Sequence, residues 1–329
     1  MLHITTREFG IWYYTCHLSP VIMFDNTVFA LFTSSLYFDG CVIKTNFETK
    51  MEIPDLLLMN EEDIKKFLDS FDNVLMDCDG VLWNRVAIPG VKETLQRLAE
   101  LGKNLYYVSN NGVKSFELYQ KHLIPCVTIP KYLESVGLKG CKIFALVTPN
   151  VRASLRAGGY EIPTEYPEDL RGIVEATKDD PDVAAVVIDM DFHFNYNSML
   201  KAIRILKRPE VQYIVGATEK YLPLTGPGLF QDIVSSTSGR TPVKIAKPSE
   251  FLKKTVIEQL KISNPQRSLF VGDMIDHDME FGTLCGFQKL FVQSGHSTLE
   301  DAISSSNPAH KPDFVVKSLG HLVQVLPQK

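Results

Sequence analysis

The chain contains 329 residues, 45% of them hydrophobic and 22% charged, which is the composition of a globular protein of about two domains and excludes a disordered or fibrous chain. Its 34 basic and 39 acidic side chains give a formal charge of -5, which excludes a protein that binds nucleic acid through a generally basic surface. The six cysteines are scattered without a CxxC pair, which indicates reduced thiols rather than a zinc site or a disulfide framework.

The first 50 residues are rich in aromatic side chains but show neither the period of a strand nor that of a helix. Residues 9–24 lack Asp, Glu, Lys and Arg, yet His17, Pro20 and the lack of a small-residue cleavage site argue against a secretion signal. No apolar stretch reaches the roughly 18 residues of a membrane span. We therefore expect a cytoplasmic protein without a membrane partner, in which residues 1–50 form an irregular extension whose place in the fold is open.

Regular patterning begins at Met51, where a lead-in helix is predicted from apolar residues at positions 64, 67, 68 and 71. Residues 74–77 then predict a buried strand that ends in an acid. A helix follows over residues 89–101, with a proline at its start and a glycine just after its end. A second strand is expected over residues 105–108.

Far downstream the same alternation returns, with a helix over residues 249–260 between strand-like runs at 243–246 and 269–273. Further strands are expected at residues 290–292 and 314–316. Short strands that alternate with helices are typical of a parallel sheet covered by helices on both faces. We therefore predict an α/β fold with a Rossmann-like core built from residues 51–141 and 243–329.

Between the two parts of this core lie residues 142–242, a segment with its own alternation of strands and helices. Strands are expected at residues 143–147, 183–188 and 213–215, and helices at residues 151–157, 198–206 and 229–236. A segment of about 100 residues is long enough to bury a core of its own. We predict that it is an inserted α/β domain and not a loop.

Polar side chains follow four of the predicted strands, and the carboxyl ends of parallel strands share the edge of the sheet where ligands bind. They are Asp77 with Asp79, Ser109 with Asn110, Lys247, and Asp273 with Asp276 and Asp278. Three or more carboxylates in one pocket repel one another unless a cation lies among them, and an all-oxygen ligand set favours Mg²⁺ over zinc. A lysine and a hydroxyl at the same edge suit a phosphate dianion. The pattern predicts phosphoryl transfer through an aspartyl intermediate.

Four short motifs occur in order: DCDGVLW at residues 77–83, SNN at 109–111, KP at 247–248 and GDMIDHD at 272–278. They resemble the motifs of the haloacid dehalogenase superfamily of phosphatases, and the insertion resembles its C2-type cap. DxDGVLW with SNN is similar to the branch that contains 4-nitrophenylphosphatase, phosphoglycolate phosphatase and pyridoxal phosphate phosphatase.

The resemblance implies that Asp77 is the nucleophile that becomes phosphorylated, and that Asp79 protonates the leaving alcohol and then deprotonates the attacking water. It implies Mg²⁺ held by the carboxylates of Asp77 and Asp273 and the backbone carbonyl of Asp79, with Asp278 orienting Lys247 or a water at the metal. The phosphate-binding residues that it implies are Ser109, Asn110 and Lys247.

In the insertion, DFHF at residues 191–194 is similar to a turn that places a histidine over the active site in mammalian-type enzymes of this branch. His193 is therefore the candidate for contact with the substrate. Each candidate also has an ordinary structural alternative. A strand-end aspartate can cap a helix, the SNN segment can form a simple turn, and Lys247 can be a surface lysine.

Three features depart from the family pattern. His277 stands where Thr is usual, directly before Asp278, and Glu219 stands where relatives usually have Asn, which is expected to alter how the cap closes. Residues 118–133 are shorter by roughly a dozen residues than the usual connection, so one sheet element is expected to be short or missing.

The leading interpretation is a Mg²⁺-dependent phosphomonoesterase for small metabolites such as phosphoglycolate, pyridoxal phosphate or 4-nitrophenyl phosphate, because a cap over the site favours small substrates. The alternatives are a phosphatase for phosphoserine on a protein partner and a non-catalytic scaffold that retains the fold. The intact candidate residues argue against a scaffold, whereas the short segment near residue 125 argues for one. Relatives commonly pair through the cap, so a homodimer is expected. The pattern does not reveal the physiological substrate.

Overall fold

The computed structural model describes residues 53–112, 123–125, 129–162, 173–222 and 225–327, together with six short strands before residue 44. By its contacts the chain divides into two units, Met1–Glu52 and Ile53–Lys329. In the first unit, a four-stranded antiparallel sheet and a hairpin form where the sequence shows no regular period. The strands are β1 (Ile4–Glu8), β2 (Ile11–Cys16), β3 (Ser19–Phe24), β4 (Thr27–Phe29), β5 (Leu36–Phe38) and β6 (Cys41–Ile43). That residues 1–50 lie outside the core fold stays a prediction.

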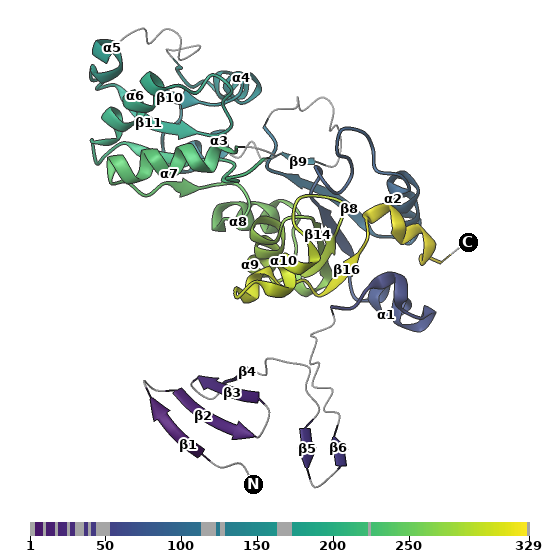
Figure 1. The fold of residues 1–329 in the computed structure, drawn as a ribbon. Coiled ribbons are helices and arrows are strands. Elements are labelled where there is room, and N and C mark those ends of the chain that lie inside the picture. Colours follow the sequence, from purple (N-terminus) through teal and green to yellow (C-terminus); the bar gives the residue numbers. More distant parts are fainter. Residues whose placement is uncertain are drawn as a thin grey trace. The chain divides into compact units, whose positions relative to one another are not determined.

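The second unit contains a six-stranded parallel sheet (Figure 1). Its strands, in spatial order, are β16 (Phe314–Val316), β15 (Gln288–Val292), β14 (Ser268–Gly272), β7 (Asn73–Met76), β8 (Asn104–Ser109) and β9 (Leu123–Pro125). Every neighbouring pair is parallel, so each connection must cross over a face of the sheet. The predicted α/β fold with a Rossmann-like parallel sheet is confirmed.

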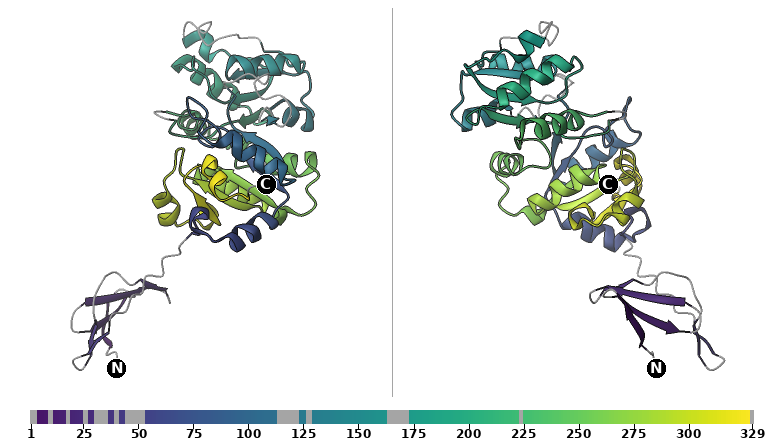
Figure 2. Two further views of the ribbon diagram at one scale, coloured as in Figure 1. Left: turned by 90° about the vertical axis from the view of Figure 1, so that its right-hand side faces the viewer. Right: turned by 60° about the vertical axis from the view of Figure 1, so that its left-hand side comes forward.

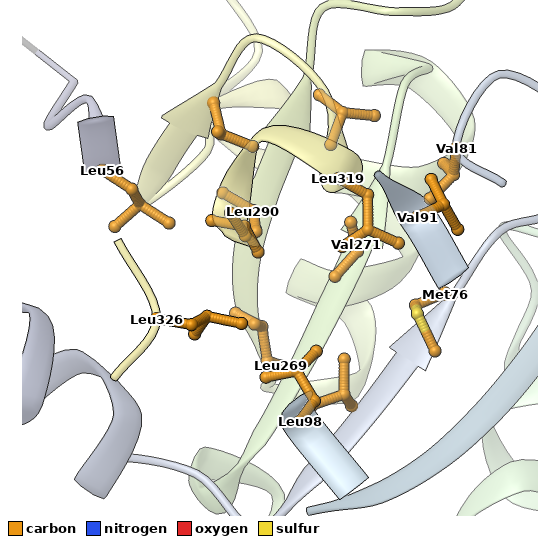
Figure 3. Close-up of a cluster of buried hydrophobic side chains, with 14 of the residues drawn as sticks. Leu56, Met76, Val81, Val91, Leu98, Leu269, Val271, Leu290, Leu319 and Leu326 are labelled. Atoms are coloured by element: carbon orange, nitrogen blue, oxygen red, sulfur yellow. The ribbon is translucent and has the colours of Figure 1, made fainter. Parts of the chain in front are cut away.

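Helices cover both faces of this sheet. They include α1 (Glu61–Asp69), α2 (Val91–Glu100), α8 (Glu250–Gln259), α9 (Glu280–Cys285), α10 (Leu299–Ser304) and the 3-10 helix η7 (Leu319–Gln324). Successive side chains of a strand point to opposite faces, and β7 is buried on both. Val74 and Met76 pack in a cluster with α1, α2 and η7, part of which Figure 3 shows, whereas Leu75 packs on the other face with α8 and α9. The loop that follows β7 is therefore anchored from both sides.

The boundaries of α2 illustrate how far local signals reach. The sequence predicts a helix over residues 89–101, and the structure has Val91–Glu100. The helix begins later because Gly90 adopts a positive φ of 81° as the N-cap residue, a conformation that only glycine adopts readily. A side chain at Gly90 would also meet the backbone carbonyl of Gly320, so a close approach of η7 adds to this requirement.

A second parallel sheet is formed by β10 (Lys142–Leu146), β11 (Val183–Ile188), β12 (Gln212–Val215) and β13 (Val243–Lys244), in that order. Its helices are α3 (Ile129–Ser135), α4 (Pro149–Ala157), α5 (Ile173–Thr177), α6 (Tyr196–Leu206) and α7 (Pro227–Ser238). Figure 2 shows this sheet, in teal and green, between its helices. One buried cluster joins the sheet to α3 and α4, and another joins it to α6 and α7. All strands of this sheet except β13 lie within the predicted insertion. The helix α3 packs on the sheet although its residues precede the predicted insertion in the sequence. The division at residues 142 and 242 stays a prediction.

The predicted short connection lies largely outside the described residues, which in this region are 123–125 and those from 129 onward. Its visible element is β9, an edge strand of three residues that pairs with β8. None of the helices in the described part of the chain has the length and apolar character needed to cross a bilayer.

Asp189, which follows β11, is a buried acid that we expect to make stability depend on pH. Burial raises its pKa to about 7, although its Oδ1 accepts hydrogen bonds from the backbone N–H groups of Met190 and Ala217, which lower it. Between the unfolded pKa near 4 and about 7 the folded state binds more protons than the unfolded state, so stability falls as pH rises through this window. The side chain of Asp189→Asn cannot titrate. Between pH 5 and pH 8 the free energy of unfolding of this variant, measured in urea, should therefore rise by about 2 kcal/mol relative to that of the native chain.

The exposed Asp182, just ahead of the same strand, provides the matched control. The variant Asp182→Asn should follow the native chain at both pH values. An Asp189→Asn difference that is equal at pH 5 and pH 8 would contradict the assignment of this titration to Asp189.

Candidate active site

The carboxyl ends of β7, β8 and β14 open onto a cavity of about 500 Å³. All the strand-end residues that the resemblance assigns to catalysis, phosphate or metal line this cavity. Asp77, Asp79, Ser109, Asn110, Asp273 and Asp278 follow strands of the six-stranded sheet, whereas Lys247 follows β13 of the second sheet. The segments around the second sheet contribute Met190, Ala217, Glu219 and Leu222. The structure thus brings residues from four distant motifs into one cavity.

Asp77 lies at the centre of this arrangement. Its backbone N–H donates to the carbonyl of Val271 at 2.9 Å, which continues the β7–β14 ladder by one residue and fixes the direction of the side chain. Only 8% of Asp77 and 2% of Lys247 are exposed. Lys247 Nζ donates to Asp77 Oδ1 at 2.5 Å and to Asp278 Oδ1 at 2.7 Å. One buried lysine is therefore shared by two buried carboxylates.

Asp278 supports both the lysine and the loop after β14. Its Oδ2 accepts hydrogen bonds from the backbone N–H groups of Asp273 and Met274 at 3.0 and 3.1 Å. It lies in a single π-helical turn, η5 (Ile275–Met279), a distortion frequent at functional sites. Both oxygens of Asp278 are thus engaged by the protein, which suits a residue that orients Lys247.

Three carboxylates form a cluster that fits a divalent cation. One oxygen from each of Asp77, Asp273 and Asp278 lies within 4.8 Å of the others. Oδ2 of Asp273 accepts from the N–H of His296 at 2.7 Å, but its Oδ1 is buried without a hydrogen-bond partner. A buried carboxylate oxygen left unpaired is costly, and a hard cation is the partner that an all-oxygen set would take.

The electrostatics of the cluster agree with its geometry. Burial, followed by the charge of Asp278, raises the pKa of Asp77 to about 7 against the opposing effect of Lys247. Burial and the charges of Asp278 and Asp77 likewise raise the pKa of Asp273. Gly80, with φ of 83°, passes so close that a side chain there would lie 2.5 Å from the Asp273 carboxyl. The loop after β7 therefore leaves no room for a side chain at position 80.

Asp79 lines the same cavity but is not one of these three carboxylates, and it is held by two side chains to which the sequence assigned no role. Trp83 Nε1 donates to Oδ1 at 2.9 Å, and Asn111 Nδ2 donates to Oδ2 at 2.8 Å. Both partners lie inside the quoted motifs, DCDGVLW and SNN, so their position in the motif was the available signal. The contribution of the Asp79 carbonyl to a metal stays a prediction.

Ser109 and Asn110 end β8 beside the lysine. Asn110 Nδ2 donates to the carbonyl of Lys247 at 3.1 Å and to Glu219 Oε1 at 2.8 Å, while its Oδ1 accepts from the N–H of Lys247 at 2.9 Å. Asn110 therefore fixes the backbone of Lys247 in place. The hydroxyl of Ser109 accepts from the N–H of Asn111 at 3.1 Å and is nearly buried in the cavity wall. Their contacts with phosphate stay predictions.

Two other candidates lie elsewhere. His193 is exposed, and it is not among the described residues that line the cavity, so its contact with substrate stays a prediction. Asp276 is also not among the described residues that line the cavity, and its Oδ1 is 2.9 Å from His277 Nδ1.

The ring of His277 contacts the predicted insertion. Its Nε2 is 3.3 Å from Thr218 Oγ1 and 3.9 Å from Glu219 Oε1. Burial lowers its pKa, but Asp276 and Glu219 outweigh burial and leave the pKa raised. The unusual histidine therefore joins the loop after β14 to the loop after β12 (Gln212–Val215).

Loss of the lysine should destabilise the protein as well as inactivate it. Lys247→Met leaves two buried carboxylates without their counter-ion, and breaking a buried pair in this way costs about 3 kcal/mol or more. We expect this loss in urea unfolding of the metal-free protein. Lys66→Met, which removes an exposed lysine with two carboxylate neighbours on α1, should leave the unfolding midpoint unchanged. Equal midpoints for Lys247→Met and the native chain would contradict the buried ion-pair geometry.

Two family models match the chain. The model described as haloacid dehalogenase-like hydrolase matches residues 74–126, and a HAD-hydrolase-like model matches residues 244–322. The matched segments carry β7, β8 and β14 and the strand-end residues after them. In the sequence they lie on either side of the segment that forms most of the second sheet.

Relatives with curated descriptions match over most of their length. The rat glycerol-3-phosphate phosphatase is 31% identical over 307 residues, which cover 82% of this chain and 95% of that protein. Mouse chronophin is 28% identical, over 80% of this chain and 96% of its own. The solved structure of a 4-nitrophenylphosphatase from Thermotoga maritima shares the fold with a TM-score of 0.66 at 24% identity, over 79% of this chain and 99% of that one.

Proposed function

Because the chain belongs to the haloacid dehalogenase-like hydrolases and is a phosphatase of that family, we propose that it hydrolyses small phosphomonoesters with Mg²⁺ through a phospho-aspartate on Asp77. The observation that carries this proposal is the meeting of Asp77, Lys247, Asp273 and Asp278 in one buried cluster at the carboxyl edge of the sheet. A scaffold has no use for such a cluster, since burial of these charges costs stability.

In the first step, Asp77 attacks phosphorus in line, and the bond from phosphorus to the leaving oxygen breaks. Lys247 Nζ lies against Asp77 Oδ1, where it can also donate to a phosphoryl oxygen and balance its charge. Asp278 keeps this lysine in place. Ser109 and the backbone N–H groups near Gly80 supply further donors to the phosphoryl oxygens.

Asp79 is the proposed acid and base. It gives a proton to the leaving alcohol and then takes one from the water that cleaves the aspartyl phosphate. Trp83 and Asn111 hold its carboxyl group in one orientation, so that the same oxygen can serve both half-reactions.

The proposed metal is held by Asp77 and Asp273, with Asp278 alongside, and the unpartnered Oδ1 of Asp273 supports this assignment. When bound, Mg²⁺ supplies positive charge that neutralises the phosphate and favours the ionised form of Asp77. The all-oxygen donor set supports Mg²⁺ over softer metals.

A cavity of about 500 Å³ supports a small metabolite as the substrate. The candidates are glycerol phosphate, after the name of the rat relative, together with phosphoglycolate, pyridoxal phosphate and 4-nitrophenyl phosphate. We also propose that residues 142–242 act as the cap, that the protein is a cytoplasmic homodimer paired through that cap, and that it takes neither nucleic acid nor membrane as a partner.

The experiment is a phosphate-release screen across phosphorylated metabolites, phosphopeptides and 4-nitrophenyl phosphate with the purified full chain and Mg²⁺. Release from small esters is the expected result. Release from phosphoserine peptides alone would favour a protein phosphatase, and no release from any ester would favour a scaffold.

A further inference from the structure

Besides Asp273, a second carboxylate in the cavity, that of Glu219, has a buried oxygen without a hydrogen-bond partner. Glu219 follows β12, lines the cavity and is 6% exposed. Its Oε1 accepts from Asn110 Nδ2 at 2.8 Å, whereas its Oε2 is buried without a hydrogen-bond partner. Buried carboxylate oxygens normally accept a hydrogen bond, and none of the described residues donates one to Oε2.

The carboxylate of Glu219 is held where it is. Asn110, its donor, is bound through both ends of its amide to the backbone of Lys247. The backbone carbonyl of Glu219 accepts from the N–H of Gly228 at 3.0 Å, which ties the loop to the start of α7 (Pro227–Ser238). The nearest titratable base, His277, lies 3.9 Å from Oε1 and contacts Thr218 instead, so it does not serve Oε2.

The charges around the cavity favour one kind of leaving group. Five carboxylates line it among the described residues: Asp77, Asp79, Glu219, Asp273 and Asp278. The described lining includes no arginine and no lysine other than Lys247, which is already shared by Asp77 and Asp278. Next to Glu219 an acidic leaving group would therefore meet negative charge, whereas an ammonium group would find a fixed acceptor. The two histidines of the described lining are His296 and His277, and the ring of His277 contacts Thr218 and Asp276.

We propose, on the basis of the phosphatase function above, that Glu219 selects phosphomonoesters whose leaving alcohol carries an ammonium group and discriminates against those whose leaving alcohol carries a carboxylate. The ammonium donates to Oε2, and the phosphate binds at Lys247. Glu219 is thus a specificity-determining residue that contacts the leaving group and takes no part in the transfer of the phosphoryl group.

The test uses three esters of equal length: 2-aminoethyl phosphate, 2-hydroxyethyl phosphate and phosphoglycolate. Values of kcat/KM are measured for the full chain with Mg²⁺ and for Glu219→Gln, which keeps the shape of the side chain and removes its charge. The native chain should prefer the aminoethyl ester over phosphoglycolate, and Glu219→Gln should reduce this ratio by about ten-fold or more, as removal of a nearby unit charge requires. The hydroxyethyl ester should change less than either charged ester.

Glu210→Gln, an exposed position near the second sheet, is the matched control and should leave the ratio unchanged. Glu219→Asp retains the charge and should keep the direction of the preference. A ratio in Glu219→Gln equal to the native one would overturn the proposal, as would a native preference for phosphoglycolate. If aminoethyl and hydroxyethyl esters fell together, a hydrogen bond without charge selection would explain the result, and the proposal would again be wrong.

These failures differ from failure of the function itself. A native chain that hydrolyses the esters without charge preference would overturn the role of Glu219 and leave the phosphatase intact. A native chain that releases phosphate from none of them, nor from 4-nitrophenyl phosphate, would overturn both.

Discussion

Asp77→Asn should release no measurable phosphate from any ester that the native chain hydrolyses, a loss on the order of 10⁴-fold or more. The amide keeps the shape of the side chain but cannot attack phosphorus, and no other carboxylate can replace it. Oδ1 and Oδ2 of Asp278 are engaged by Lys247 and two backbone N–H groups, and Asp79 is turned toward Trp83 and Asn111. Phosphate release and trapping of a labelled phospho-enzyme measure the effect.

The matched control is Asp69→Asn, an exposed aspartate on α1, which should leave both signals at the native level. Since Asn can also accept from Lys247, we expect the Asp77→Asn protein to remain folded in circular dichroism. Turnover by Asp77→Asn at a tenth of the native rate or more would assign the nucleophile to another residue.

Removal of divalent metal should abolish turnover and lower the melting temperature together. Two carboxylates about 5 Å apart repel by roughly 3 kcal/mol at an effective dielectric of about 20, and this cluster has three with one lysine among them. Saturating Mg²⁺ should therefore restore activity after EDTA treatment and raise the melting temperature by about 5 °C or more relative to the metal-free chain.

The variant Asp273→Asn separates the repulsion among the carboxylates from the stabilisation by Mg²⁺. The amide retains one oxygen toward the N–H of His296 but removes a negative charge from the cluster, so the metal-free variant should be no less stable than the native chain. It should at the same time lose most of the stabilisation by Mg²⁺ and most of its activity. Full turnover after exhaustive EDTA treatment, or an unchanged Mg²⁺ effect in Asp273→Asn, would rule out the proposed metal site.

Much of the candidate site followed from local sequence. Asp77, Ser109 and Asp273 each come directly after a short apolar run, and such a run has few alternatives to a buried parallel strand. Parallel strands end at a common edge, so the pattern alone brought these side chains to one cavity. The order of the motifs then indicated the chemistry before any contact was known.

The roles of neighbouring side chains did not follow in this way. Nothing local distinguishes Asp79, which turns to Trp83 and Asn111, from Asp278, which supports Lys247. In loops the direction of a side chain depends on the backbone turn and on partners from other strands. Asn111 lies 32 residues from Asp79 in the sequence, and Lys247 lies 31 residues from Asp278.

The chain's own order of apolar and polar residues was enough to determine the parallel core, the second α/β segment and the set of acids at the sheet edge, because each depends on periodicity within a few residues. Only the tertiary structure decided that Glu219 joins Asn110 across 109 residues of sequence, that His277 contacts Thr218, and that His193 stays exposed. Those contacts depend on how two separately packed sheets approach each other, and no local period encodes that approach.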